Sequence, residues 1–233
     1  MEIIPVIDVM AGQVVHALRG QRQAYEPIKS PLSPDPCPIS VVRGLLQLGN
    51  FKTVYVADLD ALMGLSPQTA AIQHLAAAFP HLHFWMDHGL PPMQRETDFT
   101  CEQVVSVIGS ESMTEKTLVE LDLTGRPYIL SLDFRDGQLV GPGSILKTVD
   151  LWPGRVILMN LSRVGSFDGP DFSEAARFIE RYPEHHFVSA GGIRHGRDLD
   201  ELLEIGVTAV LVASALHTGA IGRDTLNRFN LGE

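Results

Sequence analysis

The chain has 233 residues, of which 45% are hydrophobic and 20% are charged, a composition typical of one globular domain. Its formal net charge of −10 argues against nucleic acid as the main partner, because phosphate backbones are bound by clustered Lys and Arg. No apolar run approaches the roughly 20 residues that cross a bilayer, the start of the chain lacks signal-peptide features, and its two cysteines form neither a disulfide framework nor a metal-ligand spacing. We therefore expect a cytoplasmic protein without a membrane partner, a metal or a cofactor.

Short apolar, β-branched runs alternate with helical patterns along the chain, which predicts repeated βα units and a parallel sheet. Eight strands are expected, at about Glu2–Asp8, Thr53–Asp58, Leu82–Asp87, Val104–Ile108, Pro127–Asp133, Arg155–Asn160, His186–Ala190 and Thr208–Val212. Helices are expected at Pro38–Leu48, Ser66–Ala78, Ser173–Arg181 and Arg197–Ile205, whereas Pro91–Phe99 is a poor helix former. The pattern indicates an α/β protein with a single (β/α)8 TIM barrel over residues 1–233.

The stretch from His16 to Pro38 is long and contains five prolines. Long loops in compact domains are often functional, so we predict an ordered loop over one end of the barrel; a floppy insertion is the alternative. This loop carries Arg19, Arg22, Tyr25 and Lys29. They either close over an anionic substrate as a lid does or form a solvated charged surface.

Two pairs of segments resemble each other. Asp8–Val14 is similar to Asp133–Leu139, and Val107–Ser110 is similar to Leu211–Ser214, in the same order along the chain. Such internal similarity predicts two half-barrels of four βα units each, roughly residues 1–123 and 124–233.

A phosphate site is predicted after the seventh and eighth strands. A buried strand runs into Gly191-Gly192 and then towards a helix, so the backbone can approach an anion closely and direct its N–H groups at it. The next strand ends in small residues beside the same place, where this fold often binds phosphate. The predicted phosphate-binding residues are Ser189, Ala190, Gly191, Gly192, Ile193, Ala213, Ser214 and Ala215. The alternative is a tight turn needed only for chain reversal.

Asp8 and Asp133 close the first and fifth strands, which lie opposite one another in an eight-stranded barrel. Both carboxylates are therefore expected in one mouth, where one gives and the other takes a proton in acid–base catalysis. The alternative for each is a turn or helix cap.

Three further candidates follow other strands. Asp58 has either a ligand-facing or a structural role, and its neighbour Asp60 is expected to be structural. Asp87 and His88 form either a second acid–base or metal-capable pair or a plain hydrogen-bonded pair. The nine histidines give no metal-ligand spacing.

These motifs resemble the HisA/HisF family of histidine biosynthesis, and ProFAR isomerase in particular, over nearly the whole chain. The resemblance is carried by Ile3–Asp8 with Gly12–Val15, Asp58–Asp60, Ile108–Ser110, Leu132–Asp133 with Asp136–Gly137, Ser162–Arg163 with Gly165 and Gly169–Pro170, and Ala190–Arg194. It implies a barrel built from two halves, with the family's catalytic aspartates at Asp8 and Asp133.

The chain also departs from the family pattern. Asp87-His88-Gly89 stands where the resemblance implies a second Gly-rich phosphate turn, and Glu111 stands where a small residue is implied. Met159, Asn160 and Val164 replace a characteristic Thr and two Asp, and His16 stands where the cyclase relatives carry Lys. The second phosphate site is therefore expected to be lost, and ProFAR isomerase activity is not expected. The chain is similar to diverged HisA-like proteins of methanogens and methylotrophs.

The leading hypothesis is an enzyme, isomerase-like or a related lyase, that acts on a phosphorylated sugar or sugar-like metabolite and binds no nucleic acid. One alternative, from family association alone, is a role in one-carbon (tetrahydromethanopterin-type) cofactor biosynthesis with rebuilt chemistry. A second is a non-catalytic barrel that binds a phosphometabolite. A third moves the chemistry to Asp87, His88 and Glu111, with a metal. The sequence leaves the oligomeric state open.

Overall fold

A closed barrel of eight parallel strands forms the centre of the molecule. The computed structural model describes residues 1–89 and 103–230. Each barrel strand pairs with the next one along the chain, and the last closes on the first through the register Glu2↔Ala209. The barrel strands are β1 (Glu2–Met10), β4 (Thr53–Asp58), β5 (His83–Asp87), β6 (Val104–Gly109), β7 (Tyr128–Arg135), β9 (Arg155–Asn160), β10 (His186–Ala190) and β11 (Ala209–Val212).

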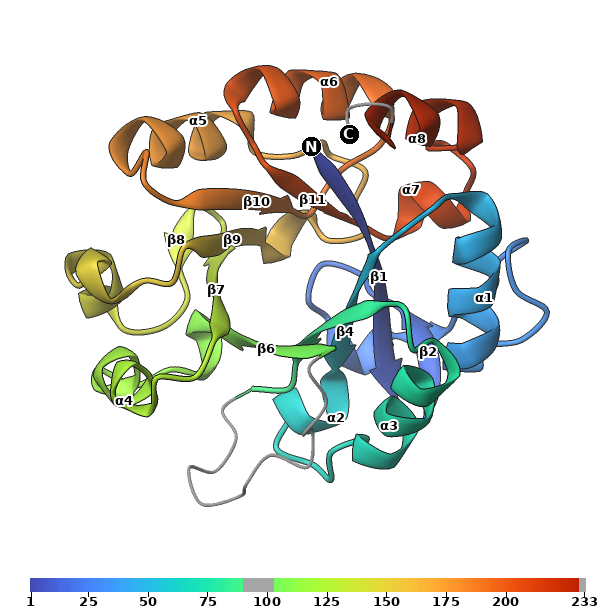
Figure 1. Cartoon of the computed structure of the whole chain (residues 1–233), viewed down its shortest axis with the longest axis horizontal. Coiled ribbons are helices and arrows are strands. Elements are labelled where there is room, and N and C mark those ends of the chain that lie inside the picture. The colour runs from blue at the N-terminus through green and yellow to red at the C-terminus, as the bar shows by residue number, and fades with distance from the viewer. Residues whose placement is uncertain (90–102, 231–233) are drawn as a thin grey trace.

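Helices surround the strands on the outside (Figure 1). They are α1 (Pro38–Leu48), α2 (Leu59–Leu62), α3 (Thr69–Ala78), α4 (Thr117–Thr124), α5 (Phe172–Arg181), α6 (Gly196–Ile205), α7 (Ser214–His217) and α8 (Arg223–Asn230). Between β7 and β9 two 3₁₀ helices, at Gly143–Lys147 and Val149–Leu151, replace a longer helix. Among the described residues, no helix has the length and apolar character of a membrane span.

Strand alternation divides the core into two layers. In β4, Val54 and Val56 pack against the helices, whereas Tyr55 and Ala57 point into the barrel lumen. Most of the lumen cluster is aliphatic, so the barrel interior is packed and leaves open space only at its ends. A ligand site is therefore confined to the loops and strand ends.

The (β/α)8 fold predicted from the sequence is confirmed. Three of the eight strands have the predicted bounds, and the other five differ by at most two residues at an end. The predicted helices are present as α1, α3, α5 and α6, with starts shifted by no more than three residues. The segment Pro91–Phe99 lies inside the stretch 90–102, outside the described residues.

Three short antiparallel strands were not predicted: β2 (Gln13–His16), β3 (Glu26–Pro27) and β8 (Gln138–Leu139). β2 forms a hairpin with β1, and β8 forms one with β7. Both hairpins turn through a residue pair with positive φ, Ala11-Gly12 (49° and 78°) and Asp136-Gly137 (52° and 75°). The matching turns follow the first and fifth barrel strands, as the internal similarity requires; the half-barrel repeat itself stays a prediction.

Candidate functional site

One cavity of about 1080 Å³ opens at the carboxyl ends of the barrel strands. Its walls come from seven of the eight barrel strands and from the segments that follow β1, β4, β6, β9, β10 and β11. Four carboxyl groups line it, those of Asp8, Asp87, Glu111 and Asp133. The other polar lining side chains are Arg22, Tyr25, Tyr55, Arg135 and Ser214.

The glycine pair after β10 forms one wall of this cavity. Gly191 and Gly192 have φ values of 100° and 84°, which side chains with a Cβ rarely adopt. A Cβ on Gly191 would lie 2.5 Å from the carbonyl oxygen of Asn160, and one on Gly192 would lie 2.3 Å from that of Gly169. Glycine is therefore required twice over, for backbone conformation and for close packing against the end of β9 and its loop.

Backbone N–H groups beside the glycine pair have free hydrogen-bonding capacity. The amides of Gly192, Ile193 and Ser214 donate to no acceptor within residues 1–89 and 103–230. Six of the eight residues predicted for phosphate binding line the cavity: Ala190, Gly191, Gly192, Ile193, Ala213 and Ser214. Ser189 and Ala215 are buried and are not part of the lining.

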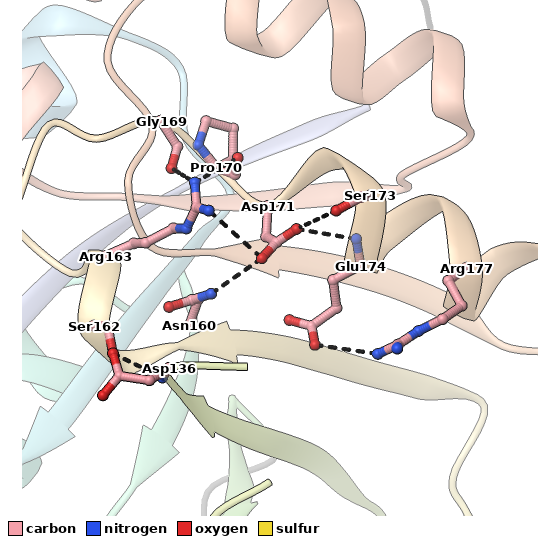
Figure 2. Close-up of polar contacts among 10 residues, drawn as sticks. All are labelled: Asp136, Asn160, Ser162, Arg163, Gly169, Pro170, Asp171, Ser173, Glu174 and Arg177. Atoms are coloured by element: carbon pink, nitrogen blue, oxygen red, sulfur yellow. Dashed lines mark hydrogen bonds and ion pairs between the residues drawn. The ribbon is translucent and has the colours of Figure 1, made fainter. Parts of the chain in front are cut away.

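A polar network fixes the loop on which the glycine pair rests (Figure 2). The Arg163 guanidinium donates to the carbonyl oxygens of Gly169 (2.8 Å) and Pro170 (3.2 Å) and lies 3.7 Å from the carboxylate of Asp171. Asp171 caps α5, and the side-chain amide nitrogen of Asn160 donates to its carboxylate at 3.5 Å. The loop after β9 is thus fixed from both sides, which holds the neighbouring glycine turn.

Asp8 lies at the end of β1 and is partly buried. In the part of the chain that the structure describes, its carboxyl group has no hydrogen-bond partner. Loss of solvation on burial, and then the charge of Asp87, raise the pKa of Asp8 to about 7, although Arg22 opposes this. Asp8 is therefore poised to hold a proton near neutral pH.

Asp133 closes β7 and is 4% exposed. Its carboxylate accepts hydrogen bonds from the Ser131 hydroxyl (2.7 Å) and the Glu111 amide (3.0 Å), while the Ser110 hydroxyl, 3.4 Å away, donates to the carbonyl oxygen of Val140 at 2.7 Å. Burial raises its pKa to about 7, and the bonds from Glu111 and Ser131 act in the opposite direction. A Cβ on Gly109 would lie 2.8 Å from this carboxylate, so the glycine leaves the space that Asp133 fills.

The wall formed by β4, β5 and the end of β6 carries acids. The Tyr55 hydroxyl donates to Asp87 at 2.7 Å, and burial is the main cause that raises the pKa of Asp87 to about 6. Arg22 from the first loop forms an ion pair with Glu111. The resemblance places a second phosphate turn in this region, but here a carboxylate and an already paired arginine line the cavity.

The remaining candidates lie elsewhere. Asp58 is buried and accepts hydrogen bonds from the amides of Ala61 (3.0 Å) and Gln68 (2.7 Å), so it caps α2 and holds the following loop. Asp60 accepts one from the amide of Ala11 (2.8 Å), as the predicted structural role implies. His88 lies 3.3 Å from the Ser106 hydroxyl and is not part of the cavity lining.

The first loop contributes residues to the site. Arg22 and Tyr25 line the main cavity, whereas Lys29 lines a second one beside it. Arg19 instead pairs with Asp168 (3.3 Å) on the exposed rim. Within the described ranges, no group of three or more His, Cys, Asp or Glu side chains is arranged to hold a metal ion.

Among the charged and polar side chains that line the cavity, sequence reasoning missed Tyr55 and Arg135. Tyr55 and Ala57 alternate with valines in β4, and this period of two was a signal that Tyr55 points into the lumen. Arg135 lies two residues after Asp133 on the same strand, and the same period placed it on the cavity side.

Comparisons with known proteins agree with this architecture. The family model described as "Histidine biosynthesis protein" matches residues 2–222. The chain belongs to this family. An uncharacterized protein of Methanocaldococcus jannaschii is 30% identical over 234 residues, covering 98% of this chain and 99% of that protein.

Other members of the histidine biosynthesis family carry an enzyme name. The 1-(5-phosphoribosyl)-5-((5-phosphoribosylamino)methylideneamino) imidazole-4-carboxamide isomerase of Chloroflexus aggregans is 28% identical and covers 95% of this chain and 94% of its own length. The isomerase of the same name from Thermococcus kodakarensis is 24% identical, and the match covers 97% of this chain and 96% of that protein. The family thus contains isomerases whose whole length this chain matches.

Proposed function

We propose that the protein is an enzyme that acts on a small metabolite phosphorylated at one end, by acid–base chemistry of the isomerase type. The observation that carries the proposal is that the carboxyl groups of Asp8 and Asp133 line the same cavity as the unpaired amides of Gly192 and Ile193. Phosphate oxygens accept hydrogen bonds from such amides. Binding of this remote group then positions the reacting carbon between the two acids.

The surroundings of the two acids support different roles. Asp133 accepts hydrogen bonds from the Glu111 amide and the Ser131 hydroxyl, which stabilise its ionised form, so it is the base that removes a proton next to the developing carbonyl or iminium group. The pKa of both groups is raised to about 7, so the difference lies in their hydrogen bonds: Asp8 accepts none within the described residues, its ionised form is the less stabilised of the two, and it is the acid that protonates the ring oxygen. This chemistry uses no group beyond the chain's own side chains.

The wall formed by β4, β5 and the end of β6 lies opposite the glycine turn. Its side chains favour a substrate other than one with two phosphoribosyl groups, which is what the isomerases' name contains. Asp87 and Glu111 line the cavity there, and the cation nearest to them, Arg22, is already paired with Glu111. An anionic group in this place would be repelled by the carboxylates. A substrate with a neutral or cationic distal end fits this wall better than one with a second phosphate. The open cavity also favours an enzyme over a barrel that only binds.

The test is proton exchange with solvent. Acid–base isomerisation of an aldose phosphate in D2O places deuterium on the carbon from which the base removes a proton. The panel would contain aldose and aminoaldose 5- and 6-phosphates and the corresponding 5- and 6-diphosphates, and ¹H NMR would follow the exchange. For a panel member that exchanges, Asp8→Asn and Asp133→Asn each lower the rate by about 10²- to 10⁴-fold. Their Kd for inorganic phosphate stays unchanged.

The matched control is Asp168→Asn, which removes a carboxylate on the exposed rim and leaves the rate as it was. Full exchange in both cavity variants would overturn the assignment of the two aspartates. Binding of phosphate without exchange of any panel member would overturn the isomerase-type chemistry.

A further inference from the structure

A second cavity of about 900 Å³ adjoins the first on the side of the first loop. Asp8, Ala213 and Ser214 belong to the linings of both cavities, so the predicted phosphate site lies at their boundary. The other charged or polar side chains of the second cavity are His16, Glu26, Lys29, His217 and Thr218. The proposed function uses none of these five.

His217 supplies a hydrogen-bond donor to this cavity. The residue is 8% exposed, and its Nδ1 lies 2.8 Å from the Ser30 hydroxyl oxygen, which also accepts a hydrogen bond from the amide of Leu32. Burial, and then the charge of His16, lower the pKa of His217 to about 4, so the ring is neutral at pH 7 and carries one proton. In the tautomer in which the Ser30 hydroxyl donates to Nδ1, the single ring proton lies on Nε2.

Nε2 has no hydrogen-bond partner among the described residues and is not one of the fully enclosed polar atoms, and His217 belongs to the lining of the second cavity. A buried imidazole with an unused donor is costly unless a ligand or water accepts that hydrogen bond. The site therefore calls for an acceptor next to His217.

The side chains near His217 also favour a ligand that accepts hydrogen bonds and carries negative charge. The Ser214 hydroxyl lies 3.3 Å from Nε2 of His16, and Lys29 brings an ammonium group with no ion pair in the described part of the chain. Glu26 and Asp8 are the two acids of the lining; Glu26 is exposed, and burial raises the pKa of Asp8 to about 7, which favours its neutral form. Donors and a cation thus surround a space continuous with the phosphate site.

We propose that the second cavity binds the outer phosphoryl group of a diphosphate, while the inner phosphoryl group lies at the amides of Gly192, Ile193 and Ser214. The inference rests on the proposed function and names its substrate class as a diphosphate ester rather than a monophosphate. His217 and Lys29 bind the outer oxygens, and Ser214 lies between the two groups. Both phosphoryl groups are then at one end of the substrate. This keeps them away from Asp87 and Glu111 on the far wall of the first cavity.

Titration calorimetry on the full chain at pH 7.5, with inorganic phosphate and inorganic pyrophosphate as probes, tests this proposal. Wild type is expected to bind pyrophosphate at least tenfold more tightly than phosphate. His217→Gln and Lys29→Ala are expected each to reduce that ratio at least threefold while the Kd for phosphate is unchanged. Lys147→Ala removes an exposed lysine outside both linings and is expected to keep the wild-type ratio.

Each outcome discriminates. If neither ion binds, the proposed function fails together with the inference. If phosphate binds and pyrophosphate binds no more tightly, or if the ratio survives in Lys29→Ala or in a folded His217→Gln, the inference is overturned and the proposed function stands. Lys29 is exposed, so its variant remains decisive even if His217→Gln does not fold.

Discussion

Replacing Asp8 by Asn is expected to stabilise the protein at alkaline pH. The pKa of Asp8 is about 7, against 3.8 for the free side chain, because burial and the charge of Asp87 disfavour its ionised form. A pKa shift of three units corresponds to about 4 kcal/mol of unfolding free energy. About half of this is expected for Asp8, because its side chain is only partly buried and solvent screens the charge. Asp8→Asn should therefore raise the unfolding free energy at pH 8 by about 2 kcal/mol.

The pH dependence has a defined sign. The folded protein binds the Asp8 proton more tightly than the unfolded chain does, so this group lowers wild-type stability progressively as the pH rises from about 4 to about 7. The gain in Asp8→Asn is thus near zero at the acid end of that range and complete above pH 7. Urea unfolding followed by the fluorescence of the buried Trp85 and Trp152 measures it. The control is Asp150→Asn, an exposed carboxylate.

Equal pH dependence in wild type and Asp8→Asn would refute the reasoning, because it would mean that Asp8 titrates as a solvated carboxylate. A loss of stability in the variant at pH 8 would refute it as well. It would show that the Asp8 carboxylate makes a favourable contact.

Three further predictions concern single groups around the site. Gly192→Ala should lower the unfolding free energy by about 1–3 kcal/mol, because φ is +84° and the new Cβ would meet the carbonyl oxygen of Gly169. Thermal unfolding measures the loss, and an unchanged Tm would contradict the close packing. Tyr55→Phe removes the hydroxyl that stabilises ionised Asp87, so the pKa of Asp87 should rise above about 6 in a ¹³C-carboxyl NMR titration; a fall would count against the assigned hydrogen bond. Asp171→Ala removes the cap of α5 and should cost about 1 kcal/mol in urea unfolding, whereas no cost would show that the cap contributes nothing.

The barrel was predictable because its strands carry a local signal. Thr53–Asp58 is an uninterrupted apolar run ended by a carboxylate, and parallel strands in a barrel end at one rim. Asp8 and Asp133 end the first and fifth strands, so their shared cavity followed from topology alone. The glycine pair at residue 191 was equally visible, because few other residues adopt its backbone conformation.

Contacts between distant segments were not predictable. Arg22 and Glu111 are 89 residues apart, and their pairing depends on the path of the first loop over the barrel mouth. The pairing of Tyr55 with Asp87 depends on the register between β4 and β5. Helix α4 has a weak sequence signal because Val119 and Leu123 are exposed, so its apolar residues form no single stripe.

A crystal structure of the protein with inorganic phosphate tests the central claim most directly. The account predicts phosphate within hydrogen-bonding distance of the amides of Gly192, Ile193 and Ser214, in the cavity that the carboxyl groups of Asp8 and Asp133 also line. Phosphate bound beside Asp87 and Glu111 instead, or amides of the glycine turn that hydrogen-bond to other protein atoms, would contradict it.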